Sequence, residues 1–99
     1  MFAIEHAESV AQDLGGLRVS ERTRILDRIE QELTYQPTEE TRNKKMLRGV
    51  KPPWEHVEPV WELRVDEYRV FYDTDETKNQ VTVRAIRHKP PHKTIEDIL

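Results

Sequence analysis

The sequence predicts an α+β fold in which an N-terminal helical hairpin covers one face of an antiparallel sheet and a short C-terminal helix follows. Three observations predict this class. Helical apolar spacing recurs within residues 7–33, strand-like alternation recurs within residues 61–88, and the last strands follow one another through short connections. Consecutive strands joined in this way pair antiparallel, and the helices must cover the apolar face of the sheet. The length of 99 residues predicts one domain spanning 1–99.

The N-terminal third of the chain predicts one strand and two helices. A first strand is expected over Met1–Glu5, and the glycines 15 and 16 end the helix that follows it. Ser20 is the expected N-cap of the second helix. Residues 36–59 contain four prolines and are expected to form a loop. The second helix carries an apolar stripe made of Ile25, Leu26, Ile29 and Leu33.

Residues 61–72 alternate as two strands around Asp66-Glu67, which predicts a hairpin with Arg64 directly opposite Arg69. One face of this hairpin is almost wholly apolar, and the other carries Glu62, the two arginines and Phe71. Facing arginines repel each other, and a fold tolerates them best where an anion binds. Phosphate is the anion that guanidinium donors suit best. The apolar face consists of Trp61, Leu63, Val65, Tyr68, Val70 and Tyr72.

Residues 81–88 predict a third strand, and prolines 90 and 91 end it. Regular alternation puts Val81, Val83 and Ala85 on one face. Thr94 and Asp97 form a predicted capping box that opens the final helix. The face of the sheet that the helices leave uncovered is expected to collect Arg64, Arg69, Arg84 and His88.

The composition excludes several classes of protein. There is no cysteine, so disulfide scaffolds and thiolate chemistry are excluded and a reducing cytoplasm is favoured. No apolar run is long enough to span a membrane, and no signal peptide is expected. We expect no metal site, because two prolines prevent a helix between His88 and His92. The net charge of −3 argues weakly against nucleic acid, yet residues 84–93 hold four bases and no acid.

Several segments resemble the RelE/ParE superfamily of toxin–antitoxin toxins. They are Leu47-Arg48-Gly49, the hairpin strands 61–65 and 67–72, and the segment 85–89, and the resemblance covers most of residues 20–95. The resemblance implies a RelE-like toxin that cleaves mRNA on the ribosome and inhibits translation. It also implies neutralisation by a cognate antitoxin, binding to operator DNA only as the toxin–antitoxin complex, and no metal or organic cofactor.

The resemblance assigns active-site arginines to Arg48 and Arg69, and a basic or histidine position to His88 or Lys89. Cleavage in this family is attack of a 2′-oxygen on the adjacent phosphate, which needs a proton acceptor, cationic donors and a proton donor. His88 is the candidate acid, and Glu62 is the candidate base or a salt-bridge partner whose charged form the flanking cations favour. Supporting charge for phosphate and RNA is expected from Arg64, Arg84, Lys89, Lys44 and Lys45, although the basic run could also be a solvated loop.

This sequence departs from the best-known nuclease of the family, which has two lysines where Val60 and Glu62 stand and a tyrosine where Ile95 stands. Two alternatives therefore remain open. One is a ParE-like toxin that inhibits DNA gyrase by binding, and the other is a degenerate, non-catalytic member. Trp61 is expected in the core, and Trp54 either stacks on a base or covers an apolar edge.

Overall fold

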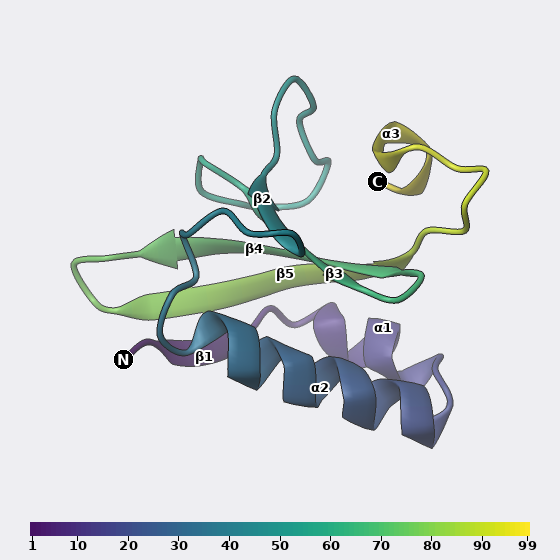
Figure 1. The fold of residues 1–99 in the computed structure, drawn as a ribbon, viewed down its shortest axis with the longest axis horizontal. Coiled ribbons are helices and arrows are strands. Elements are labelled where there is room, and N and C mark those ends of the chain that lie inside the picture. The colour runs from purple at the N-terminus through teal and green to yellow at the C-terminus, as the bar shows by residue number, and fades with distance from the viewer.

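The computed structural model describes residues 1–99 and has a five-stranded sheet with both helices of the N-terminal hairpin on one face (Figure 1). The α+β class predicted from the sequence is confirmed. In chain order the elements are β1 (Ala3–His6), α1 (Val10–Gly15), α2 (Val19–Leu33), β2 (Lys44–Met46), β3 (Trp61–Val65), β4 (Tyr68–Asp75), β5 (Gln80–His88) and α3 (Ile95–Ile98).

The strands lie in the order β1-β5-β4-β3-β2. Neighbours from β2 to β5 pair antiparallel, and this agrees with the prediction for the strands of the C-terminal half. β1 instead pairs parallel to β5, so the sheet is mixed rather than wholly antiparallel. The antiparallel rule applies to strands joined by short connections, whereas β1 and β5 are the first and last strands of the chain.

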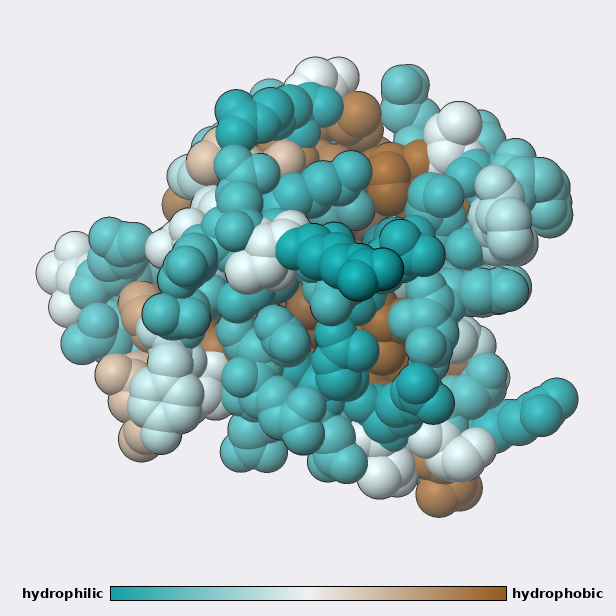
Figure 2. All heavy atoms as spheres, viewed as in Figure 1, coloured by the Kyte–Doolittle hydropathy of each residue, from teal (hydrophilic) through white to brown (hydrophobic).

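The main core lies between the sheet and the two helices. Ile25, Ile29 and Leu33 of α2 are buried as the predicted stripe requires, while Leu26 is half-buried outside the core. Every residue of the predicted apolar hairpin face packs in or against this core. Figure 2 shows hydrophilic side chains over most of the viewed face, with hydrophobic atoms mainly in recesses among them.

Three local expectations are wrong. α2 starts at Val19 rather than after Ser20, because the Glu21 carboxylate accepts the backbone N–H of Arg18 at 3.2 Å and so stabilises an earlier first turn. α1 starts at Val10, three residues after Ala7, where the helical apolar spacing begins. The expected loop 36–59 contains β2, whose three residues pair with β3 and extend the sheet by one strand.

β5 contains a bulge that the sequence pattern did not reveal. Val83 pairs with Tyr72 and Ala85 pairs with Phe71, so Arg84 is an extra residue between the two pairs. The expectation that Ala85 shares the face of Val83 is therefore wrong. Beyond the bulge, Ile86 packs in the main core and Ala85 packs on the other face.

The sheet face opposite the N-terminal helices was expected to be uncovered, but in the structure it is covered. Residues 47–60 and α3 lie over it (Figure 1). Val60, Phe71 and Ala85 form a second small core there, because loop and helix residues supply the apolar atoms that cover it. The residues that cover this second core are Leu47, Trp54, Ile95, Ile98 and Leu99. None of the three helices has the length and apolar character that a membrane span requires.

Candidate functional site

The β3–β4 hairpin places two arginines opposite each other at the end of the sheet. The register pairs Arg64 with Arg69, as predicted, and the two-residue turn between the strands contains Asp66 with a φ of 54°. Aspartate tolerates this left-handed conformation better than most residues. Arg64 is exposed, whereas Arg69 is only 8% exposed. The site therefore has one guanidinium held by the fold and one that is free to reach a ligand.

Backbone carbonyls of the turn hold the guanidinium of Arg69. Its Nη1 donates to the carbonyl oxygens of Asp66 at 3.1 Å and Tyr68 at 2.9 Å. Burial lowers the pKa of Arg69, with the repulsion of Arg64 as a smaller effect in the same direction and the attraction of Glu62 opposing both. Arginine nevertheless stays protonated in proteins. The fold thus presents a fixed cation at this position.

Glu62 lies on the same face and is buried, with 4% of its surface exposed. Its Oε1 is 3.9 Å from both the Nζ of Lys45 and the Nε of Arg69, while its Oε2 has no hydrogen-bond partner. Burial raises the pKa of Glu62, and the attractions of Lys45, Arg69 and Lys89 only partly oppose this effect. The flanking cations favour the charged form, as expected, but burial outweighs them, because the distances of 3.9 Å are too long for hydrogen bonds.

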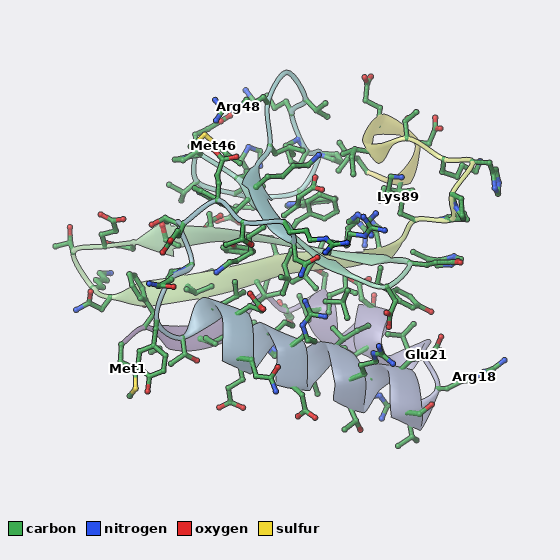
Figure 3. The ribbon with its side chains drawn as sticks, in the orientation of Figure 1. Met1, Arg18, Glu21, Met46, Arg48 and Lys89 are labelled. Carbon is green, nitrogen blue, oxygen red and sulfur yellow. The ribbon has the colours of Figure 1, made fainter.

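A cavity of about 300 Å³ adjoins the Glu62 carboxylate. Lys45 and Arg48 line it from one side and Ile95 of α3 lines it from another. Arg48 is 69% exposed and its Nη2 lies 3.1 Å from Oε1 of Glu40, which also lines the cavity. Figure 3 shows Arg48 and Lys89 on the side of the sheet opposite the two N-terminal helices. The cavity therefore has room for a small group beside Glu62, Lys45 and Arg48.

Two of the residues predicted to bind phosphate or RNA are engaged inside the fold. The ammonium of Lys44 is buried and donates to the carbonyl oxygens of Glu32, in the last turn of α2, at 3.0 Å and of Gln36, beyond its end, at 2.8 Å. Arg84 is 17% exposed and pairs with Asp73 at 2.8 Å. Each side chain already has its acceptors within the protein, so neither is presented at the site.

His88 lies on the helix side of the sheet, away from Arg69 and Glu62. It is paired with Tyr68, and the ring centroids are 5.2 Å apart. Its Nε2 lies 3.1 Å from Oε1 of Glu67. The placement differs from the expected one because the bulge at Arg84 shifts the alternation of β5 by one residue. The charge of the next residue, Lys89, is one of the attractions that lower the pKa of Glu62. Figure 3 shows Lys89 on the same side of the sheet as Arg48.

Arg87 is a residue that the sequence reasoning missed. The bulge pairs it with Arg69, so it stands on the site's face. Its Nη1 bonds both carboxylate oxygens of Asp13 at 3.2 Å, and its guanidinium carbon lies 5.0 Å from the ring centroid of Trp54. Trp54 also packs against Phe71 and so covers an apolar edge. Only a known register for β5 would have revealed Arg87, because residue type and spacing alone gave no signal.

The chain has the fold of RelE toxins. A chain of the RelE–RelB complex from Pyrococcus horikoshii OT3 is 18% identical with a TM-score of 0.69, and the match covers 94% of this chain and 98% of that chain. For the toxin–antitoxin complex RelBE2 of Mycobacterium tuberculosis the values are 19%, 0.69, 89% and 98%. For the isolated Escherichia coli RelE toxin they are 17%, 0.67, 97% and 92%. At these identities the likeness is one of fold.

No protein-family model and no curated protein sequence matches the chain. The RelE fold predicted from residues 47–49, 61–72 and 85–89 is nevertheless confirmed by the structural comparison. The chemistry of the site depends on this chain's own residues. These residues combine a buried carboxylate with an unpartnered oxygen, one fixed guanidinium and a set of lysines on the same face.

Proposed function

We propose that this protein is a RelE-like toxin that cleaves mRNA on the ribosome and thereby inhibits translation. One observation carries the proposal: the buried Glu62 carboxylate has an Oε2 without a hydrogen-bond partner and a raised pKa beside the fixed guanidinium of Arg69. A carboxylate with a raised pKa is a stronger proton acceptor than an exposed one. An adjacent guanidinium suits the phosphate group that must be attacked.

In the proposed reaction Glu62 accepts the proton of a ribose 2′-hydroxyl. The 2′-oxygen forms a bond to the adjacent phosphorus, and the bond from phosphorus to the 5′-oxygen of the next nucleotide breaks. The products are a 2′,3′-cyclic phosphate and a free 5′-hydroxyl. The pentacoordinate phosphate gains negative charge during this step, and Arg69 with Arg64 supplies donors to stabilise that charge.

The leaving 5′-oxygen needs a proton, and we assign that role to Lys89 instead of His88. The charge of Lys89 lowers the pKa of Glu62, whereas His88 lies on the other face of the sheet beside Tyr68. Lys45 and Arg48 are assigned to the RNA backbone around the cavity. The proposed reaction involves no metal ion.

A cognate antitoxin is the proposed partner of this toxin, with operator DNA bound only by their complex. Support comes from the solved structures that share the fold, several of which are RelE–RelB complexes. The ribosome and mRNA are the proposed targets in the cytoplasm, and the toxin acts as one domain over residues 1–99. The cationic side chains of Arg48, Arg64 and Lys89, none of them buried, offer phosphate contacts for such targets.

Primer extension on a defined mRNA in a purified translation system tests the proposal. The wild-type chain is expected to cut at codons positioned in the ribosome, and Glu62→Gln and Arg69→Ala are expected to lose the cuts. Glu58→Gln and Lys78→Ala are matched controls, because both side chains are exposed and lie outside the cavity. Intact mRNA and undiminished translation with the folded wild-type chain would overturn the proposal.

A gyrase-binding toxin of the ParE type is the second candidate. Its support is that Val60 and Ile95 stand where the best-known nuclease has a lysine and a tyrosine, and both pack in the second core here. A DNA supercoiling assay discriminates the two functions. Inhibited supercoiling with intact mRNA would favour gyrase binding, and no effect in either assay would identify a non-catalytic member.

A further inference from the structure

The β3–β4 turn is tied to α2 by polar side chains rather than by apolar packing. A cavity of about 290 Å³ separates the turn from the start of α2, and its lining includes Glu21, Arg24 and Tyr68. The Nε of Arg24 lies 2.8 Å from Asp66, and the hydroxyl of Tyr68 donates to Oε2 of Glu21 at 3.0 Å. The position of the turn therefore depends on a few identifiable contacts across this cavity.

Of these contacts, the bond between Tyr68 and Glu21 is the better shielded. The Arg24–Asp66 pair is more than half exposed on both sides, and such pairs contribute little. Tyr68 is half-buried, and its ring packs between the main core and His88. Burial and the bond to Glu21 both raise the pKa of Tyr68, while that bond lowers the pKa of Glu21. The hydroxyl thus stays protonated and donates to a charged acceptor.

Tyr68 is also in contact with the guanidinium of Arg69. Its carbonyl oxygen accepts from Nη1 of Arg69 at 2.9 Å, and the carbonyl of Asp66 accepts from the same nitrogen. One residue therefore bonds α2 through its side chain and Arg69 through its backbone. A shift of the turn relative to α2 moves both carbonyls on which the orientation of Arg69 depends.

We propose that Tyr68, through its hydroxyl bond to Glu21, is a positioning residue that sets the orientation of the Arg69 guanidinium for phosphate. Glu21 is the matching residue on α2, and its backbone partner Arg18 fixes it at the first turn of that helix. Figure 3 shows Glu21 and Arg18 on the helix side of the sheet, remote from Lys89 and Arg48. Neither Tyr68 nor Glu21 contacts the substrate in this arrangement. The inference rests on the proposed nuclease function but makes a separate claim.

Two readouts on Tyr68→Phe test the claim, since this change removes the hydroxyl and keeps the ring. The first is the cleavage rate in the purified translation system, where kcat is expected to fall about tenfold with KM unchanged, because misplaced groups cost rate more than binding. The second is the nitrogen-15 NMR signal of the Arg69 Nε–H, assigned by its loss in Arg69→Lys. We expect this signal to shift in Tyr68→Phe.

Three further variants separate positioning from general loss of structure. Glu21→Gln keeps an acceptor for the hydroxyl and is expected to restore near wild-type kcat, whereas Glu21→Leu is expected to behave as Tyr68→Phe does. Glu21→Leu leaves β4 intact, so it makes the same test if Tyr68→Phe fails to fold. Tyr35→Phe is the matched control, because that tyrosine is 70% exposed at the far end of α2.

The outcomes distinguish this claim from the proposed function. Cleavage by the wild type with unchanged kcat and an unchanged Arg69 signal in Tyr68→Phe would overturn the positioning role and leave the nuclease proposal standing. If the wild type cleaves no mRNA but the Arg69 signal shifts in Tyr68→Phe, the positioning role would be supported and the nuclease proposal overturned. Equal losses in Glu21→Gln and Glu21→Leu would also contradict the claim.

Discussion

The Oε1 of Glu62 lies 3.9 Å from the Nε of Arg69, and both residues are more than nine-tenths buried on the same face of the sheet. A buried pair at this distance has attraction without a hydrogen bond, so the charge of Glu62 is only partly compensated. The folded protein keeps a carboxylate in an unfavourable environment. Such uncompensated groups are common where a site performs chemistry.

The first prediction concerns the stability of the Glu62→Gln variant. Burial raises the folded-state pKa of Glu62 above its unfolded value, so the folded protein favours the protonated form. At pH 7 the neutral glutamine is expected to increase the free energy of unfolding relative to wild type. This advantage should shrink as the pH falls through the folded pKa and vanish below the unfolded pKa. Urea unfolding between pH 4 and pH 8 measures the difference. Glu58→Gln, at an exposed position, should show no such trend.

The second prediction compares two substitutions of Arg69. Arg69→Ala is expected to reduce kcat for mRNA cleavage by about 10²-fold or more, as removal of one electrostatic donor does in other enzymes. Arg69→Lys keeps the charge but cannot reach both turn carbonyls and a phosphate with a planar fork, so it should lose most of the activity as well. Full activity in a folded Arg69→Ala protein would contradict the role of this residue. Circular dichroism verifies the fold.

The third prediction ranks His88 and Lys89. Lys89→Ala is expected to slow cleavage at least tenfold, because the leaving oxygen would lose its proton donor. His88→Ala should cost no more than about threefold, because the His88–Glu67 pair is exposed and lies across the sheet from Glu62. Single-turnover cleavage rates measure both effects. The reverse ranking would return the acid role to His88 and contradict the assignment made from the structure.

The fourth prediction concerns Arg48 and its neighbour Glu40. The 3.1 Å pair between them is largely exposed, so Glu40→Gln should change stability by less than about 0.5 kcal/mol. It should, however, tighten RNA binding, because Arg48 no longer has a carboxylate that competes with phosphate. The dissociation constant for a short RNA, measured against salt concentration, is expected to fall about threefold at low salt. Glu39→Gln, which lies outside the cavity, is the control.

The fifth prediction concerns Lys44, whose ammonium is bonded to carbonyl oxygens at the C-terminal end of α2 and just beyond it. Lys44→Ala should destabilise the protein by roughly 2 kcal/mol, because it leaves the carbonyls of Glu32 and Gln36 without their donor. Lys45→Ala, one residue further along β2, should cost far less because its side chain is 62% exposed. Denaturant unfolding of both variants tests the contrast. Equal costs would show that the buried contacts of Lys44 contribute little.

Strand alternation predicted the hairpin completely because its two strands pair regularly. Arg64 faces Arg69 in the structure, and the apolar residues between positions 61 and 72 lie on the core side. The pattern failed in β5 because one extra residue, Arg84, interrupts regular pairing at a point that residue type does not mark. The predicted partnership of His88 with the arginines failed for that reason.

Residue type also could not predict which charged side chains are buried. Lys44 and Lys45 are adjacent and identical in type, yet one is buried and the other is exposed. Their difference depends on β2, a strand of three residues inside a segment that its prolines identified as a loop. The pKa of Glu62 was misjudged for the same reason. The charged neighbours of Glu62 could be inferred from sequence. The burial that residues 47–60 and α3 give this face of the sheet could not.

The bulge at Arg84 has a consequence for how this chain tolerates changes of length. Removing that residue would leave Val83 opposite Tyr72 and Ala85 opposite Phe71, and β5 would then pair without interruption. The end of the strand beside β1 and the end beside the hairpin would both keep their partners. A one-codon deletion at this point would thus leave the register on both sides of it unchanged. Arg87, His88 and Lys89 would keep their orientation in such a deletion, but the buried Asp73 carboxylate would lose its guanidinium partner.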